Sequence, residues 1–277
     1  MRPVDSIAAL GRARTAASPA SRLLRGLACA AALGAGAARA AEGVPAALVD
    51  DLVAANHILA DQGVVDGFGH VSVRHPGDPN RFLMSRSLAP ALVKPDDIME
   101  FDLDGNALDA RGRAVFLERF IHGEIYRARG DVQAVVHSHS PAVIPFGITG
   151  APLRAAYHIA AFLAGGVPVF DIRQAAGATD MLVRDPALGR ALAATLGAGP
   201  VALMRGHGDV VVGSTIPMAV FRAVYTEVNA RVQGQAMALG GPVTYLDAAE
   251  SEKADKALDQ IHLRAWDLWK RKAAEAR

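Results

Sequence analysis

The chain is poor in cysteine, has no excess of one charge, and contains no long apolar run after residue 41. Cys29 is its only cysteine, so a disulfide framework is excluded. Lysine and arginine number 29 and aspartate and glutamate 28, and much of the basic excess lies near the N-terminus. This balance gives no electrostatic reason to expect a nucleic acid or an anionic membrane as partner. No apolar segment after residue 41 reaches the roughly twenty residues that a membrane span needs.

After its first forty residues the chain alternates short apolar runs with amphipathic segments, and its length suits one domain with a sizeable core. Pro45 opens an expected helix that Gly63 ends. Strands are expected at residues 70–74, 82–85, 98–103, 132–139, 167–171, 201–204 and 209–212. Further helices are expected from residue 118, after Pro141, and at residues 180–196, 216–239 and 247–272, the last as a terminal helix. Pro186 must break or restart the helix at residues 180–196.

The clearest chemical signal is an apolar run, Ala134-Val135-Val136, that ends in His137-Ser138-His139. Alternate side chains of a β-strand point to the same face. His137 and His139 would therefore lie close enough to share one divalent ion, which makes them half of a metal site.

Two more residues complete the expected site. Glu118 lies upstream in a segment with a helix-like period, which would turn back into the strand that ends at His139. His207 stands between Gly206 and Gly208, just after an apolar run, and glycines let the backbone come close to a ligand. Three imidazoles and one carboxylate form a normal catalytic set for Zn²⁺ or a similar ion.

Five separated motifs resemble the class II aldolase/adducin family in order and spacing, over roughly residues 45–245. They are residues 69–74 (Gly-His-Val-Ser-Val-Arg), Glu118 with His122, residues 126–129, residues 134–139 and residues 206–208. The resemblance implies an α/β fold, a three-layer α/β/α sandwich with a mainly antiparallel central sheet, and usually a homotetramer. It also implies that His137, His139 and His207 bind the metal and that Glu118 is the acid/base carboxylate. His122 is expected to pack against or orient its neighbours.

The chain departs from the sugar-phosphate aldolases of this family at two places. Before the helix, those enzymes have a sequence similar to Pro-Ser-Ser-Glu, in which the serines help to bind phosphate. Residues 115–118 of this chain are Val-Phe-Leu-Glu. The usual asparagine of the Gly-Asn-x-Ser-x-Arg motif is His70. A phosphate without these donors would be poorly compensated, and a buried unpaired charge is costly. A phosphorylated sugar is therefore disfavoured as substrate.

The chemistry of the family suggests what replaces it. Aldol cleavage and the loss of CO₂ from a β-keto acid or a hydroxybenzoate leave the same kind of enolate, which a metal stabilises. Residues 118–129 and 137–147 resemble the decarboxylase branch, which is associated with dihydroxyphthalates and carboxylated hydroxymuconic semialdehydes. We therefore predict a metal-dependent decarboxylase of a hydroxylated aromatic or muconic semialdehyde carboxylic acid. Zn²⁺ or Mn²⁺ is expected first, and Fe²⁺, Co²⁺ or Mg²⁺ is also compatible with the ligands.

Each remaining part of the expected site has an assigned role. Glu118 delivers a proton to the carbon that loses CO₂, or first helps to form the keto tautomer. His70 and Arg86 are the candidates for binding the anionic end of the small-molecule substrate, because they occupy loops that serve this purpose in the family. The alternatives are a loop-stabilising histidine at position 70 and a solvated arginine at position 86.

Two other function classes stay open. One is a metal-dependent aldolase or epimerase that acts on a non-phosphorylated hydroxy-carbonyl compound. The other is a non-enzymatic binding module like adducin. The presence of all four residues of the expected site argues against the second class, because a scaffold needs no open metal site.

Residues 1–40 predict a signal peptide that is cleaved after Ala40, which leaves residues 41–277 as a single domain. Five arginines precede position 26, and an Ala/Leu/Gly run from Gly26 to Ala38 leads to Ala38-Arg39-Ala40. The pattern predicts export to a bacterial periplasm. The alternative is a mis-called start or an unstructured tail on a cytoplasmic enzyme, which agrees with the mostly cytoplasmic breakdown of aromatic rings.

Overall fold

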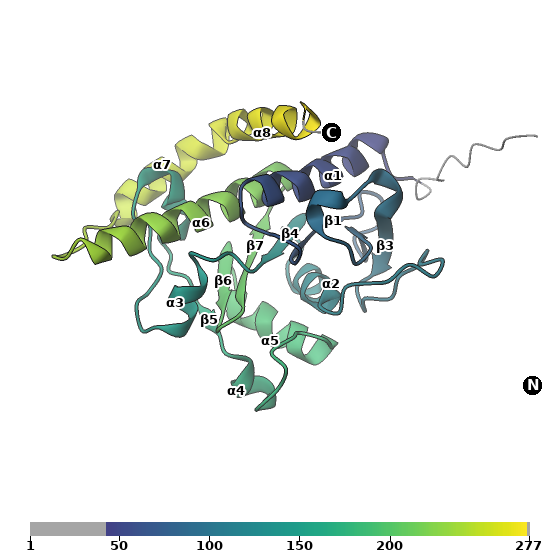
Figure 1. The fold of residues 1–277 in the computed structure, drawn as a ribbon, viewed down its shortest axis with the longest axis horizontal. Coiled ribbons are helices and arrows are strands. Elements are labelled where there is room, and N and C mark those ends of the chain that lie inside the picture. The colour runs from purple at the N-terminus through teal and green to yellow at the C-terminus, as the bar shows by residue number, and fades with distance from the viewer. Residues whose placement is uncertain (1–42, 276–277) are drawn as a thin grey trace, which may run out of the picture. The chain divides into compact units, whose positions relative to one another are not determined.

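A seven-stranded sheet forms the centre of residues 43–275, the part of the chain that the computed structural model describes (Figure 1). The strands are β1 (His70–Arg74), β2 (Arg81–Ser85), β3 (Ile98–Asp102), β4 (Ala134–Ser138), β5 (Val169–Phe170), β6 (Val201–Met204) and β7 (Gly208–Gly213). Their order is β3-β2-β1-β4-β7-β6-β5, and only the β5–β6 pair is parallel. The mainly antiparallel sheet is therefore confirmed. The predicted signal peptide, residues 1–40, lies outside the described residues.

Helices cover both faces of this sheet, as Figure 1 shows. On one face lie α1 (Ala46–Asp61) and α6 (Ile216–Ala238), with α7 (Ala248–Ile261) and α8 (Leu263–Glu275). On the other lie α2 (Arg119–Ala128) and α5 (Pro186–Leu196). Short helical segments complete the chain: α3 (Ile144–Ile148), α4 (Ile172–Ala176), and 3₁₀ turns at Pro90–Leu92, Pro95–Asp97 and His158–Leu163. These layers confirm the predicted α/β/α sandwich.

The alternation of side chains along β4 decides which way its histidine points. Ala134 and Val136 pack into the apolar cluster under α1 and α6, whereas Val135 packs into the cluster under α2 and α5. His137 follows Val135 by two residues, so its side chain faces the α2 layer. The register that pairs His70 of β1 with His137 puts a second histidine beside it.

Three predicted helices have other bounds than expected. The terminal helix is broken after Ile261, where the ring of His262 donates a hydrogen bond to the carbonyl of Asp259, and it continues as α8. Residues 180–185 are not helical, because α5 begins at Pro186, where a proline fits the first turn and Asp185 caps the helix. The helix predicted after Pro141 begins only at Ile144.

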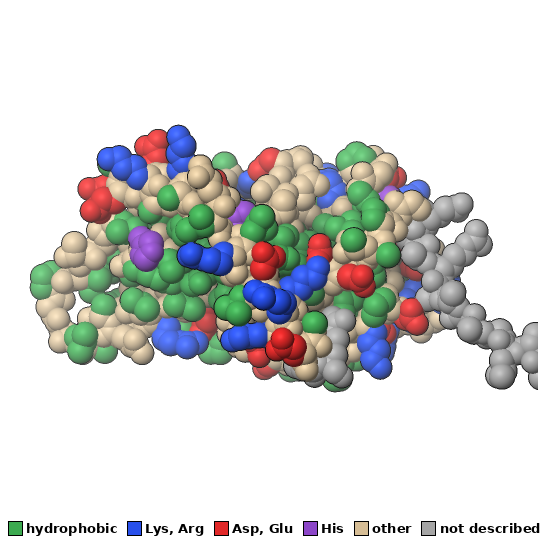
Figure 2. Space-filling model, turned by 90° about the horizontal axis from the view of Figure 1, so that it is seen from above, with side chains coloured by type: hydrophobic (Ala, Val, Ile, Leu, Met, Phe, Trp, Pro, Cys, Tyr) green, Lys and Arg blue, Asp and Glu red, His purple; other side chains and the backbone are tan. Residues whose placement is uncertain are grey.

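The face of the molecule seen in Figure 2 carries lysine and arginine side chains interspersed with aspartate and glutamate. This face therefore presents no broad field of one sign. Elsewhere in the described part of the chain, an ion pair joins Lys270 of α8 to Asp51 of α1. Among the described residues, no helix combines the length and the apolar character that crossing a membrane requires.

Glycines allow α2 to approach its neighbours closely. A Cβ at Gly123 would overlap the backbone carbonyl of Leu103, which follows β3. A Cβ at Gly189 of α5 would come within 2.6 Å of the backbone oxygen of Phe120. Because these contacts are with backbone atoms, which cannot rotate away, α2 is held tightly in place, and Glu118 lies at its first turn.

We expect Gly123→Ala to destabilise the fold by about 1–3 kcal/mol, because the added methyl group forces the backbone apart. The matched control is Gly234→Ala in α6, where no atom lies within 4 Å of the added Cβ. That control should be neutral or stabilising by about 0.5–1 kcal/mol, since alanine favours a helix. Urea unfolding of both variants measures the difference, and equal midpoints would contradict the close packing of α2.

Candidate metal centre

His137 is held by its backbone environment with one ring nitrogen free. It is the fourth residue of β4 and only 1% exposed. Its Nδ1 lies 2.9 Å from the backbone carbonyl of Asp209 on the neighbouring strand, so Nδ1 carries the proton and donates. Nε2 is then the nitrogen available to a ligand. This buried atom has no hydrogen-bond partner among the described residues. A histidine fixed in this way is prepared to bind a metal ion through Nε2.

His207 is fixed in the same manner from a tight turn between β6 and β7. Gly206 adopts a positive φ of 63°, and a Cβ at Gly208 would overlap the backbone of Ser138. These two glycines let the turn lie against the end of β4. The Nδ1 of His207 donates to the backbone carbonyl of Met181 at 3.1 Å, which leaves Nε2 as the free nitrogen.

His139 lies one residue beyond the end of β4, so the strand is shorter than predicted, but its ring still converges with the other two. Its Nε2 lies 3.0 Å from the Nε2 of His207. The ring centroids of His137 and His139 are 5.1 Å apart. The prediction that both side chains of the His-Ser-His segment face one point thus agrees with the geometry.

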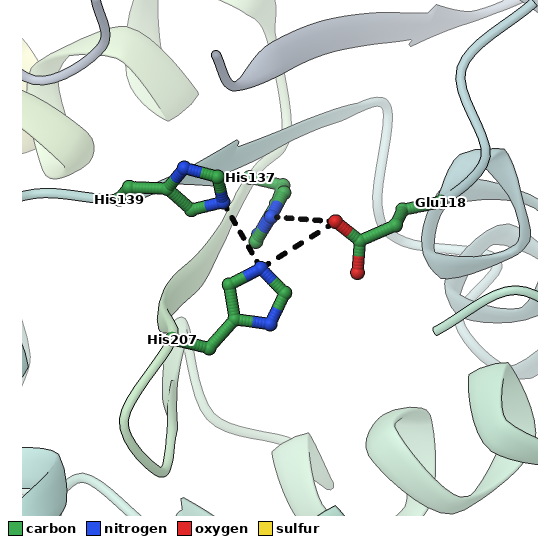
Figure 3. Close-up of side chains that lie close together, drawn as sticks. All are labelled: Glu118, His137, His139 and His207. Atoms are coloured by element: carbon green, nitrogen blue, oxygen red, sulfur yellow. Dashed lines mark hydrogen bonds and ion pairs between the residues drawn. The ribbon is translucent and has the colours of Figure 1, made fainter. Parts of the chain in front are cut away.

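Glu118 precedes the first residue of α2 and completes the cluster (Figure 3). Its Oε2 lies 3.5 Å from Nε2 of His137 and 3.4 Å from Nε2 of His207. Its Oε1 accepts a hydrogen bond from the backbone N–H of Val183 at 2.9 Å, which fixes the carboxylate. One ligand atom from each of Glu118, His137, His139 and His207 lies within 4.8 Å of the others.

This donor set fits a divalent ion. Two Nδ1 atoms are committed to backbone carbonyls, so the Nε2 atoms of His137 and His207 converge on one carboxylate oxygen. With no ion bound, a proton lies between these atoms, as the pKa of His137 indicates, since despite burial it is raised by Glu118. An ion bound there would replace that proton and give His137 Nε2 a partner. Three imidazole nitrogens and one carboxylate oxygen suit Zn²⁺, Mn²⁺ or a related ion.

Glu118 and His139 have the protonation states that metal ligands need. Burial lowers the pKa of His137, but its pairing with Glu118 outweighs this and raises it, so a bound ion would release a proton there. Burial raises the pKa of Glu118, but hydrogen bonds and charge from His137 and His207 outweigh it, and the pKa is held well below its usual range. Burial, with His137 and His207 nearby, lowers the pKa of His139 to about 4. At neutral pH the carboxylate is therefore ionised and this imidazole neutral.

A cavity of about 430 Å³ opens onto the cluster, which is a normal size for a small-molecule site. Glu118, His137 and His139 form part of its wall. The rest of the lining is His70 and Ser87 with Gly67, Phe68, Gly69, Leu88, Ala89, Phe116, Leu117 and Leu182. Among the described residues that line this cavity there is no lysine or arginine. The cavity thus joins three of the four residues of the cluster to mostly apolar walls.

The other predicted site residues are divided between the cavity and its surroundings. His70 is the first residue of β1 and lines the cavity, with its ring 4.6 Å from that of Phe116. Arg86 does not line it, because its Nε lies 2.6 Å from a carboxylate oxygen of Asp97. His122 is fully buried behind His70, where it bonds to its neighbours as expected.

Some contributors to the centre were missed from the sequence. The two backbone carbonyls that orient His137 and His207 leave no signal in residue types, because every residue has one. Ser72, which contacts His122, could have been found, since alternation along the predicted strand at residues 70–74 places it on the same face as His70.

Comparisons with known proteins agree with this geometry. Residues 50–234 match the family model described as the Class II Aldolase and Adducin N-terminal domain. Decarboxylase tropJ of Talaromyces stipitatus is 37% identical over 82% of this chain and 95% of its own length. A 3,4-dihydroxyphthalate decarboxylase of Rhodococcus jostii is 32% identical over 70% of this chain and 82% of its own.

A solved structure of an aldolase has a similar fold. The L-fuculose 1-phosphate aldolase of Glaciozyma antarctica superposes with a TM-score of 0.70 at 25% identity, over 83% of this chain and 89% of that one. The family model covers most of the chain, and the two decarboxylases are matched over 95% and 82% of their own lengths. The chain therefore belongs to the class II aldolase and adducin family.

Proposed function

We propose that this protein is a divalent-metal-dependent decarboxylase of a hydroxylated aromatic or muconic semialdehyde carboxylic acid. The observation that carries the proposal is the cluster of Glu118, His137, His139 and His207, of which the first three line a cavity with mostly apolar walls. Relatives named as decarboxylases at 37% and 32% identity support this choice of reaction among the lyases of the family.

The walls of the cavity favour a planar, non-phosphorylated substrate. Phe116 and Leu117 occupy the two positions before Glu118 that correspond to the serines of the Pro-Ser-Ser-Glu pattern, and both line the cavity. Arg86 pairs with Asp97 instead of facing the cavity. A phosphate dianion there would lose its hydration without gaining a cationic partner, whereas an aromatic ring could pack against Phe116 and Phe68.

A divalent ion held by His137, His139 and His207 would supply Lewis-acid stabilisation of the negative charge that develops when CO₂ leaves. Glu118 is then the group that moves the proton. Because its pKa is held well below the usual range, the resting carboxylate is ionised and must take up a proton before it can give one. This order favours the route in which Glu118 acts first as a base.

Each proton that moves in this route has a donor and an acceptor. Glu118 accepts the proton of a substrate hydroxyl and places it on the ring carbon that bears the carboxylate, which forms the keto tautomer. The bond from that carbon to the carboxylate then breaks, CO₂ leaves, and its electron pair restores the ring and the phenolate. One proton from solvent neutralises the phenolate. The bond from Val183 N–H to Oε1 holds the carboxylate in position, with Oε2 turned toward the histidines.

Replacing His139 by alanine is expected to remove bound metal and decarboxylation together. The loss of metal affinity should exceed the roughly 10- to 100-fold that removal of an outer-shell partner costs. His158→Ala is the matched control, since His158 is exposed and lies outside the cluster. Elemental analysis of the purified proteins and CO₂ release from a panel of hydroxylated phthalates and muconic semialdehydes measure both effects. An unchanged metal content in His139→Ala would contradict the site.

Glu118→Gln keeps the shape of the side chain but removes the base. We expect the variant to retain its metal and to lose about 10²- to 10⁴-fold in kcat, the usual contribution of a general acid–base. Single-turnover CO₂ release with product analysis measures the loss. Wild-type rates in this variant would exclude Glu118 as the proton carrier, and an aldehyde product without CO₂ would favour the aldolase reaction over the decarboxylase.

A further inference from the structure

A chain of four buried polar side chains runs from the cavity into the core behind the metal centre. Nδ1 of His70 lies 2.6 Å from Nε2 of His122, and Nδ1 of His122 lies 2.6 Å from Oγ of Ser72. Oγ of Ser72 in turn lies 2.8 Å from the hydroxyl of Tyr126. His70 and Ser72 come from β1, and His122 and Tyr126 from α2. All four are buried, so each proton in the chain must find a partner within it.

The two hydroxyl groups decide the direction in which these bonds point. Among the described residues, Ser72 Oγ is the one hydrogen-bond acceptor found for the hydroxyl of Tyr126. If Tyr126 donates to Ser72, the Ser72 proton goes to Nδ1 of His122. His122 is then protonated on Nε2 and donates to Nδ1 of His70.

This direction leaves His70 with its own proton on Nε2. Among the described residues the ring of His70 has one hydrogen bond, from its Nδ1 side to His122, and His70 lines the cavity, so we infer that Nε2 is directed toward the cavity. The ring of His70 lies 5.0 Å from that of His137, beside the metal centre. An N–H donor therefore faces the space where substrate would bind.

The opposite direction is disfavoured because it strands a hydroxyl proton. If His70 donated to His122 and His122 to Ser72, either the Ser72 or the Tyr126 proton would have no acceptor in the chain. Burying a donor without a partner costs enough to reduce that arrangement about 5- to 150-fold. The direction in which both hydroxyl protons have acceptors is the one in which Tyr126 donates to Ser72 and Ser72 donates to His122.

The chain is suited to fixing a tautomer and not to supplying a proton. Burial raises the pKa of Tyr126, so removal of its proton is unfavourable. Burial and the nearby His137 lower the pKa of His122 to about 3, so it stays neutral. Burial together with His122 and His137 also lowers the pKa of His70. All four groups therefore remain uncharged at neutral pH.

We propose that Ser72, acting through His122, is a positioning residue that holds His70 with its Nε2–H facing the cavity, where it donates a hydrogen bond to a substrate oxygen. The donor part of this inference rests on the proposed function of the cavity, but the fixed tautomer does not. A neutral donor suits a carboxylate, carbonyl or phenolate oxygen, and it cannot accept a bond from a hydroxyl or ammonium group. His70 thereby selects substrates that present an acceptor beside the metal centre.

The test reads the tautomer directly. Zinc-loaded protein with ¹⁵N-labelled histidine is studied at pH 7 without substrate, and two-bond ¹H–¹⁵N correlations report which ring nitrogen carries the proton. His70→Gln assigns the signal. Wild-type His70 should be protonated on Nε2 alone. Ser72→Ala should populate both tautomers, because His122 Nδ1 loses its donor and the preference of about 5- to 150-fold disappears.

Tyr126→Phe is the matched control. It removes a hydroxyl from the same chain but leaves Ser72 able to donate to His122, so His70 should keep the wild-type tautomer. If Ser72→Ala is too unstable, the double variant with Tyr126→Phe removes both hydroxyls and leaves none stranded. An Nδ1-protonated His70 in the wild type, an unchanged tautomer in Ser72→Ala, or a switch in Tyr126→Phe would each overturn the proposal.

Kinetics separate this inference from the proposed reaction. Ser72→Ala should raise KM for CO₂ release several-fold more than it lowers kcat, in contrast to Glu118→Gln. If no substrate in the panel releases CO₂, the proposed function fails while the tautomer spectra still test the role of Ser72. If CO₂ is released and His70 has the other tautomer, only the role of Ser72 fails.

Discussion

The candidate metal centre depends on two hydrogen bonds from histidine Nδ1 atoms to backbone carbonyls. The bonds from His137 to Asp209 and from His207 to Met181 fix each ring and its tautomer. They leave both Nε2 atoms directed toward Glu118. Without these bonds the rings could rotate or take the other tautomer, and the convergence of ligands would be lost. The rest of the fold serves to bring these carbonyls to the right places.

The sheet provides that placement. Antiparallel pairing of β4 with β7 brings Asp209 opposite the end of β4, and the turn that carries His207 follows from the same pairing. Pairing of β4 with β1 adds His70 on the other side. Close contact of α2 with the sheet, through Gly123, sets the position of Glu118. Four segments that are distant in sequence therefore meet because two strand registers and one helix contact are fixed.

Burial gives these groups their chemical character. A buried carboxylate between imidazoles is costly unless its charge is compensated, and here His137 and His207 provide that compensation and keep Glu118 ionised. His70 of β1 and His122 of α2 stay neutral because burial lowers the pKa of each imidazole. Charged and neutral side chains thus lie within one small region, each kept in a defined state by its hydrogen bonds.

The sequence by itself predicted the fold and the four residues that the structure brings together in one cluster. His137 and His139 follow an apolar strand, His207 stands between glycines, and the spacing of five motifs identified the sandwich, because these patterns are local or belong to the family. Only the tertiary structure decided that Arg86 pairs with Asp97, that the terminal helix breaks before α8, and that Ser72 contacts His122 and Tyr126. Such contacts depend on strand register and on backbone carbonyls, and neither is encoded in the type of any single residue.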